Sequence, residues 1–287
     1  RGQKFDLSDG GNAKLLAEFY SNKMRFNHTN KKWYVWNGQY WHKDTKKETY
    51  SYALEVSKVR QRDAITIKDT REKNAMFSFG VRSGDKAKID SMLSVAAALP
   101  QFSTSNEDWD QDDLMLQCRN GVLNLLDGNL IKGKPSFMIS QCSGTTYDPM
   151  AKCPTFDRFL FDIMDGDEEL VEYLLMCLGY SMSGLTDEQC MFILNGNGAN
   201  GKSVLLDIMS YMYGDYLVHT RFDAFLKKYN NTSTNDLARL SNARMVTANE
   251  SGVGKNWDEE RIKEVTGGDR ITARFLYGEY FEFQSKI

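Results

Sequence analysis

The sequence predicts an α/β protein whose P-loop core carries a mostly parallel sheet, preceded by a mixed, largely helical N-terminal domain. The first observation is the octapeptide of residues 196–203, which reads GNGANGKS and matches the phosphate-binding pattern G-x-x-x-x-G-K-[ST]. The second is its context, because an apolar run at residues 191–194 predicts a strand before the loop and residues 204–209 begin a helical pattern. The third is the apolar stretch of residues 245–248, which is typical of a buried parallel strand.

The first predicted elements of the N-terminal domain are a helix and an aromatic hairpin. Residues 11–22 have helical spacing, with Asp9 nearby as a cap. Residues 32–42 predict a hairpin around an Asn37-Gly38 turn. Its aromatic side chains could stack on the bases of single-stranded nucleic acid, but a small aromatic core is the interpretation we favour.

Two prolines within residues 149–154 mark the C-terminal boundary of this domain. Apolar spacing predicts a mostly helical region at residues 50–99, amphipathic helices at residues 155–183 and a short helix at residues 236–240. Turn residues predict strands around a tight turn at residues 121–131.

The glycine-rich loop supplies the chemistry for binding a nucleoside triphosphate. Glycines let successive backbone N–H groups point at one anion, and the following helix adds its unpaired N–H groups and the positive end of its dipole. We expect Lys202 to reach the β- and γ-phosphates of ATP and the Ser203 hydroxyl to bind Mg²⁺. The predicted nucleotide-binding residues are Gly196, Asn197, Gly198, Ala199, Asn200, Gly201, Lys202, Ser203 and Val204.

A carboxylate follows the predicted strand of residues 245–248. Glu250 would lie beside the phosphates, because ligands of parallel sheets gather at the carboxyl ends of the strands. It could help to hold Mg²⁺ or accept a proton from the attacking water. The predicted catalytic residues are therefore Lys202 and Glu250, and the predicted metal ligands are Ser203 and Glu250.

Three runs of residues make the chain resemble the superfamily 3 helicases of phage and plasmid primase-helicase proteins and their poxvirus relatives. Residues 200–203 look like that family's first motif, and residues 248–251 look like its second. Residues 263–269, followed by residues 272–274, are similar to the motif that distinguishes this superfamily from other P-loop ATPases. The resemblance extends upstream through markers at residues 5–7, 11–13, 120–125, 147–149, 153–154 and 178–180.

The resemblance implies an ATP-dependent DNA helicase or translocase that acts in replication of a phage, plasmid or other mobile element. It implies an AAA+-type core, a homo-hexameric ring with single-stranded DNA in its channel, and a fused or associated primase domain. An arginine finger from the neighbouring subunit would complete the ATPase site. The resemblance also divides the chain into an N-terminal domain, a helical collar or linker and a helicase core, at residues 1–150, 151–185 and 186–287.

The alternation of apolar residues between 271 and 283 predicts a hairpin. The resemblance places such a hairpin in the channel of the ring, where Arg274 could hold a phosphate and Tyr277 could brace a base. Lys263 is a second basic candidate for binding DNA. The sequence leaves open whether Arg274 pairs with a nearby carboxylate instead, since a guanidinium favours both partners.

Two departures from the family pattern matter for this interpretation. Asn249 stands where many members carry the first of two adjacent acids, so Mg²⁺ would depend more on Ser203 and water. The family's third motif, a strand ending in a sensor Asn, is expected shortly after residue 283, and the chain stops at Ile287. With Arg1 in place of Met at the start, we expect this chain to be a piece of a longer polypeptide.

Composition narrows the class further. The net charge is −3, from 36 Lys and Arg against 39 Asp and Glu, which is not the balance of a protein that coats DNA but does not exclude a ring motor.

No apolar stretch is long enough to span a bilayer, so we expect a cytoplasmic protein without a membrane partner. The five cysteines lack metal-ligand spacing and are interpreted as small buried side chains in a reducing compartment. The basic run at residues 60–71 and the acidic run at 106–113 are interpreted as solvated surface.

Other functions remain open from the sequence. A P-loop phosphotransferase would need an acceptor site and leaves the run at residues 263–274 unexplained. An ATP-binding initiator or assembly module that does not unwind DNA is kept open by Asn249. An RNA helicase is a third alternative, although the sequence holds no feature that reads the 2′-hydroxyl.

Overall fold

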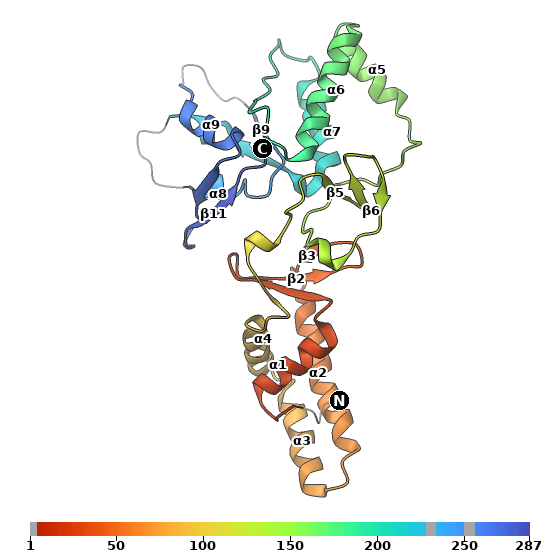
Figure 1. The fold of residues 1–287 in the computed structure, drawn as a ribbon, viewed down its shortest axis with the longest axis vertical. Helices are drawn as coiled ribbons and strands as arrows, with labels where there is room; N and C mark the ends of the chain where they lie inside the picture. The colour runs from red at the N-terminus through yellow and green to blue at the C-terminus, as the bar shows by residue number, and fades with distance from the viewer. Residues whose placement is uncertain (1–4, 228–233, 250–255) are drawn as a thin grey trace. The chain divides into compact units, whose positions relative to one another are not determined.

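The computed structural model describes residues 5–227, 234–249 and 256–287. The chain divides into two compact units, drawn in Figure 1. The N-terminal unit consists of Arg1–Trp109 with Lys134–Ser140, and the C-terminal unit consists of Asp110–Gly133 with Gln141–Ile287. The domain boundaries expected at residues 150 and 185 remain predictions.

Helices make up most of the N-terminal unit, as predicted for residues 11–22 and 50–99. The side chain of Ser8 caps the first helix by accepting the Gly11 N–H at 2.9 Å, so the expected cap at Asp9 was one residue off. The second and third helices run side by side as a helical hairpin (Figure 1). The four helices are α1 (Asp9–Tyr20), α2 (Glu48–Ile65), α3 (Thr70–Arg82) and α4 (Lys86–Ala97).

A four-stranded sheet accompanies these helices. The predicted hairpin is confirmed, because β2 (Lys32–Trp36) and β3 (Trp41–Lys43) are antiparallel, with Trp36 opposite Trp41. Tyr34 and Trp41 of the hairpin form a buried cluster with Trp109, which confirms the aromatic core rather than an open stacking platform. The sheet order is β3-β2-β1-β4, with β1 at Met24–Asn27 and β4 at Ser103–Thr104.

A buried arginine contradicts part of the surface expectation for residues 60–71. Arg60 is fully buried, and its guanidinium donates to the Asn12 side chain and to the backbone oxygens of Phe5 and Asp6, each at 2.9 Å. Each of the three guanidinium nitrogens thereby meets an acceptor, and hydrogen bonding of this kind is the condition for burying a cation. A basic residue in a mixed sequence run gives no sign of this partner set, because its acceptors lie about fifty positions away.

The C-terminal unit is mixed α/β with three small sheets, and the single, mostly parallel sheet expected of a P-loop core is not clearly present in the described residues. Two strands, β8 (Leu217–Arg221) and β9 (Met245–Asn249), pair in parallel. The strand predicted at residues 245–248 and the hairpins predicted at 121–131 and 271–283 are confirmed. The antiparallel strands are β5 (Met115–Cys118), β6 (Gly121–Asn124), β7 (Leu130–Ile131), β10 (Arg270–Ala273) and β11 (Phe281–Gln284).

The strand predicted before the glycine-rich loop was wrong. Residues 191–194 belong to no strand, and their side chains are between 37% and 68% exposed. A strand needs a neighbour whose N–H and C=O groups complete its hydrogen bonds. Within the described residues β8 and β9 pair only with each other, so residues 191–194 have no neighbouring strand. Apolar composition alone was therefore not enough to make this run a strand.

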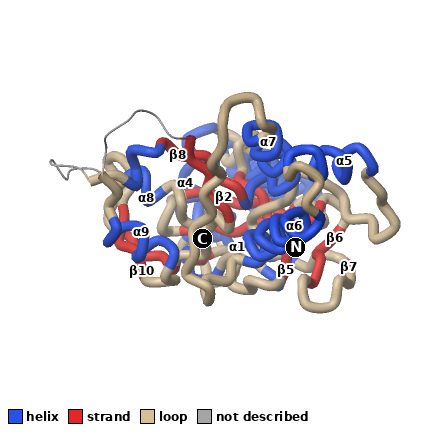
Figure 2. Tube along the Cα trace, turned by 90° about the horizontal axis from the view of Figure 1, so that it is seen from above, coloured by secondary structure: helices blue, strands red, loops and turns tan. Residues whose placement is uncertain are grey.

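Five helices in the described residues complete this unit, and the amphipathic helices predicted at residues 155–183 are confirmed as two. Helices α5, α6 and α7 share one apolar core with β5 and β6, and Figure 2 shows the three helices gathered together. A second core joins α8, α9 and the β10–β11 hairpin. The helices are α5 (Pro154–Ile163), α6 (Glu168–Ser183), α7 (Lys202–Tyr213), α8 (Asn235–Ala238) and α9 (Glu259–Thr266). Short 3-10 turns lie at η2 (Asn106–Asp108) and η3 (Pro135–Phe137) in the N-terminal unit, and at η4 (Gly214–Tyr216) and η5 (Phe222–Phe225) in the C-terminal unit.

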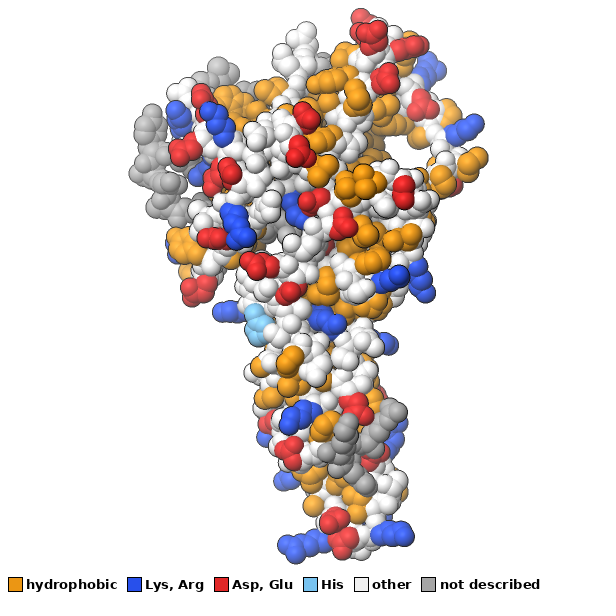
Figure 3. All heavy atoms as spheres, in the orientation of Figure 1, with side chains coloured by type: hydrophobic (Ala, Val, Ile, Leu, Met, Phe, Trp, Pro, Cys, Tyr) orange, Lys and Arg blue, Asp and Glu red, His pale blue; other side chains and the backbone are white. Residues whose placement is uncertain are grey.

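Two features of the surface concern the function, and the second departs from an expectation. Apolar side chains lie exposed over α5 and α6, where Figure 3 shows them in orange. Cys118 and Cys142 are buried as expected, whereas Cys153 and Cys190 are exposed. No helix in the described part of the chain is both long and apolar enough to cross a membrane.

Candidate functional site

The glycine-rich loop runs directly into helix α7, as the motif requires. Gly201 is the N-cap residue and Lys202 is the first helical residue. The first bond of the helix runs from the Leu205 N–H to the Gly201 oxygen at 2.9 Å. The N–H groups of residues 202–204 therefore have no acceptor within the helix, which gives the loop the donor set of an anion site.

The ammonium of Lys202 is held inside the turn of the loop. Its Nζ donates to the Gly196 oxygen at 2.8 Å, to the Asn197 oxygen at 3.3 Å and to Asn200 Oδ1 at 2.7 Å. The loop thus surrounds the ammonium of its own lysine and keeps this positive charge near the N-terminus of α7. Phosphate oxygens are stronger acceptors than these neutral oxygens, so an entering triphosphate could take over the ammonium.

Gly201 is required where the loop meets helix α5. Its φ is +83°, in the left-handed region that favours glycine. A Cβ at this position would lie 2.5 Å from Cγ2 of Ile163 and 3.2 Å from Cε2 of Phe159. The loop is therefore packed tightly against α5 at the second glycine that the motif fixes, while Gly198 at its crest has no atom within 4 Å of such a Cβ.

The remaining predicted nucleotide ligands lie on an open surface. Ser203 and Val204 are exposed on the first turn of α7, and residues 196–199 are exposed as well. The Ser203 hydroxyl is therefore accessible to a metal ion. Glu250, the other predicted metal ligand and the predicted catalytic carboxylate, lies outside the described residues.

The second motif begins on the parallel pair of strands. β9 ends at Asn249, which is exposed and lies opposite Arg221, the last residue of β8. The carboxyl ends of both strands therefore face the same edge, where parallel sheets place their ligand-binding residues.

The run of residues 263–274, which most resembled a known motif, forms the second half of α9, a glycine turn and β10, the first strand of the β10–β11 hairpin. Gly268 has φ +69°, and a Cβ there would collide with the Thr186 hydroxyl. The glycine turn is thus packed onto the segment that leads toward the glycine-rich loop. Lys263 lies exposed on α9 before this turn.

The tip of the hairpin carries the other predicted DNA-binding residues. Tyr277 is fully exposed with φ +61°. The guanidinium carbon of Arg274 lies 4.7 Å from the centre of the Tyr280 ring. Within the described residues Arg274 forms no ion pair, which argues against the carboxylate pairing that the sequence left open. The backbone N–H of Arg274 donates to Thr234 Oγ1 at 3.0 Å, which ties the hairpin to α8.

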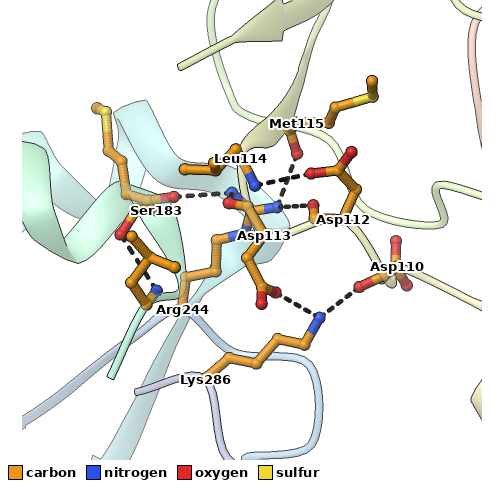
Figure 4. A network of polar contacts seen from close by, with 10 residues as sticks. Asp110, Asp112, Asp113, Leu114, Met115, Ser183, Arg244 and Lys286 are labelled. Atoms are coloured by element: carbon orange, nitrogen blue, oxygen red, sulfur yellow. Dashed lines mark hydrogen bonds and ion pairs between the residues drawn. The ribbon is translucent and has the colours of Figure 1, made fainter. Parts of the chain in front are cut away.

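Sequence reasoning missed a polar network centred on Arg244, which is drawn in Figure 4. Arg244 directly precedes β9 and is only 5% exposed. Its guanidinium donates to four backbone oxygens, and three of these belong to the acidic run that was interpreted as solvated surface or to the residues just after it. Asp110, in the same run, is buried. The acidic composition of the run was a signal for basic partners, but it does not identify them.

Comparison with known proteins finds a family and a relative that match the part of the chain containing this site. Residues 194–287, which contain the loop, the second motif and the hairpin, match a family of unknown function. The chain is similar to a protein of Acanthamoeba polyphaga mimivirus described as "Putative helicase", with 31% identity over 185 residues. The aligned part is 62% of this chain and 19% of that protein, so the chain spans about a fifth of its relative's length.

The N-terminal match is the more extensive one. Residues 13–165 match the family model described as "D5 N terminal like". This region includes most of α1, all of α2 to α4, the four-stranded sheet and the β5–β7 sheet, and it ends just after α5. Because the match covers more than half of the sequence, the chain belongs to the family described as D5 N terminal like.

Proposed function

We propose that the chain carries the ATP site of a replicative DNA helicase or translocase of the primase-helicase type, with the motor of a superfamily 3 enzyme. The observation that carries the proposal is the loop of residues 196–203, which opens α7 and holds the Lys202 ammonium beside unpaired helix N–H groups. The similarity to a protein described as a putative helicase supports the nucleic-acid part of the proposal.

The residues present fit a magnesium nucleotide. The donors at the start of α7 and the Lys202 ammonium would bind and neutralise the phosphates. The exposed Ser203 hydroxyl would help to hold Mg²⁺, which would supply positive charge to neutralise the phosphates. Glu250 would orient or deprotonate the attacking water, and an arginine from a neighbouring subunit would stabilise the transition state. A homo-hexameric ring is the assembly in which such a neighbour is supplied.

The hairpin supports the DNA-binding part. A single strand in the channel would meet an exposed aromatic ring at Tyr277 and a guanidinium at Arg274 that is not neutralised by a carboxylate in the described residues. Aromatic stacking and phosphate contact are the two interactions that hold single strands without reading their sequence. Lys263 would add a second positive charge on α9.

The test is ATP hydrolysis by the polypeptide that carries this chain, with and without single-stranded DNA. Lys202→Ala and Glu250→Gln are expected to abolish hydrolysis, whereas Lys152→Ala, at an exposed lysine outside the site, should leave it unchanged. Arg274→Ala and Tyr277→Ala should lower the stimulation by DNA roughly tenfold while keeping the basal rate, because each base stacked on an aromatic side chain is worth about 1–3 kcal/mol. Strand displacement then separates a helicase from a translocase.

Other outcomes would favour other functions. Nucleotide binding without hydrolysis would point to an ATP-gated initiation or assembly module. Hydrolysis indifferent to DNA would contradict the motor and favour a phosphotransferase, and stimulation by RNA alone would move the substrate to RNA.

A further inference from the structure

We propose that Arg244 is a positioning residue of the ATPase site, which fixes strand β9 relative to α6 and α7 by binding the acidic segment of residues 110–115. This inference rests on the proposed function. The guanidinium donates to Met115 O at 2.7 Å, to Asp113 O at 2.9 Å and to Asp112 O at 3.3 Å. It also donates to Met182 O at 2.8 Å, in the last turn of α6.

The electrostatics of this arrangement explain why a cation is tolerated there. A buried charge is costly unless it is paired or fully hydrogen-bonded. Here the acceptors are backbone carbonyls, and Met182 O belongs to the unpaired carbonyls at the negative end of the α6 dipole. The guanidinium carbon also lies 4.6 Å from the centre of the Tyr216 ring, which adds a cation–π contact.

The position of Arg244 in the chain links this network to the site. Its backbone N–H donates to Tyr216 O at 2.9 Å, and Tyr216 is the last residue of η4, between α7 and β8. Arg244 therefore links the beginning of β9 to the short turn that connects α7, the helix that starts at Lys202, to β8. β9 then leads in five residues to Asn249, at the edge where the second motif begins.

A second basic side chain binds the same acidic segment. Lys286 Nζ lies 2.7 Å from Asp113 Oδ1 and donates to the Asp110 oxygen at 2.5 Å. Tyr216 is tied to the strand that follows the segment, because its hydroxyl accepts the Gln117 N–H at 3.0 Å. The segment is thus an internal part of the C-terminal unit, bound by residues 129 to 176 positions further along the chain.

The experiment compares two arginine-to-lysine substitutions in the full polypeptide. A lysine keeps the charge but cannot reach four carbonyls with one planar group. We expect Arg244→Lys to lower kcat for ATP hydrolysis roughly tenfold with KM and nucleotide affinity changed less than about twofold, as for a misplaced catalytic group. Arg60→Lys is the matched control, because Arg60 is as buried and donates to backbone oxygens in the N-terminal unit. It should lower the melting temperature and leave kcat per folded molecule unchanged.

Each outcome has a distinct meaning. If wild-type protein hydrolyses ATP and both variants differ only in melting temperature, Arg244 is merely structural and the inference is overturned. If wild-type protein does not hydrolyse ATP, the proposed function fails first. Should Arg244→Lys not fold, Lys286→Met tests the same segment more gently, and a fall in kcat of roughly threefold at unchanged KM is the expected result. An unchanged kcat there would again overturn the inference.

Discussion

At the scale of single residues, two of the three glycines of the loop, Gly198 and Gly201, are predicted to respond differently to substitution. Gly201→Ala should lower the free energy of unfolding by about 2 kcal/mol, since left-handed backbone costs an L-residue about 1–2 kcal/mol and the new methyl would press on Ile163. Gly198→Ala is the control, because its Cβ would meet nothing within 4 Å. Chemical denaturation of both variants measures the difference. Equal effects would mean that the loop is not held against α5.

Two buried tyrosines predict how stability responds to alkali. Burial raises the pKa of Tyr213 and of Tyr216 well above the ordinary value. A raised folded-state pKa favours the neutral form in the fold, so this contribution is complete below the unfolded pKa of about 10 and is lost as pH rises above it. The free energy of unfolding should fall there by up to about 1.4 kcal/mol per pH unit for each tyrosine.

The alkaline prediction is checked with Tyr213→Phe. Its hydroxyl donates to Leu178 O, so the variant will start less stable at neutral pH. Above pH of about 10 its unfolding free energy should decline less steeply with pH than that of the wild type. Parallel declines would show that Tyr213 ionises in the folded protein.

The residues of the site differ in how far the sequence could predict them. Lys202 and its loop follow from a local pattern, because eight consecutive residues carry the whole geometry. Arg244 could not be predicted, since its acceptors lie 62 to 132 positions away and are backbone atoms that any residue type supplies. Local chemistry is readable from sequence, whereas a partner brought near by folding is not.

At the scale of elements, adjacent helices offer a test of capping. Asp69 caps α3 by accepting the Glu72 N–H at 2.8 Å, whereas Asp85 caps α4 without a side-chain hydrogen bond. Asp69→Ala should therefore cost about 1 kcal/mol of unfolding free energy. Asp85→Ala should cost only the helix-dipole term, about 0.3–1 kcal/mol at low salt. Thermal unfolding of the two variants in low and high salt measures both losses of stability. A larger loss of stability for Asp85→Ala than for Asp69→Ala would contradict the prediction.

Element prediction succeeded where the signal is local. The helices of residues 11–22, 50–99 and 155–183 follow apolar spacing, and the hairpins follow turn residues such as Asn37-Gly38. The strand expected at residues 191–194 failed because an apolar run says that a segment could be buried, not which strand it pairs with. Pairing depends on the rest of the sheet, which lies elsewhere in the chain.

At the scale of the whole molecule, the compact units do not follow the order of the chain. The backbone leaves the N-terminal unit after Trp109, returns at Lys134 and leaves again after Ser140. A boundary deduced from prolines marks one point in the sequence, so it cannot describe a chain that leaves a unit and later returns to it. The D5-like region of residues 13–165 accordingly contributes to both units. Its later part supplies strands β5 and β6 to the core that packs on α7.

This arrangement predicts which fragments fold. A fragment of residues 110–287 keeps the acceptors of Arg244 and the contact of Gly144, whose N–H donates to Met212 O at 3.1 Å beside α7. A fragment of residues 186–287 lacks both, together with the apolar face that Leu116, Leu160 and Leu174 present to α7. We expect the longer fragment to unfold cooperatively, and we expect the shorter one to show little protection from hydrogen exchange.

The comparison uses circular dichroism and hydrogen exchange on both fragments beside the intact chain. Protection of α7 should match the intact chain in the longer fragment and be lost in the shorter one, since helices derive most of their stability from packing. A cooperative transition in the shorter fragment would show that the loop, α7 and the hairpin form an independent domain. Loss of α7 protection in the shorter fragment would instead mean that the D5-like region is a structural part of the nucleotide-binding unit. A substitution in the D5-like region would then also change the stability of the glycine-rich loop and α7.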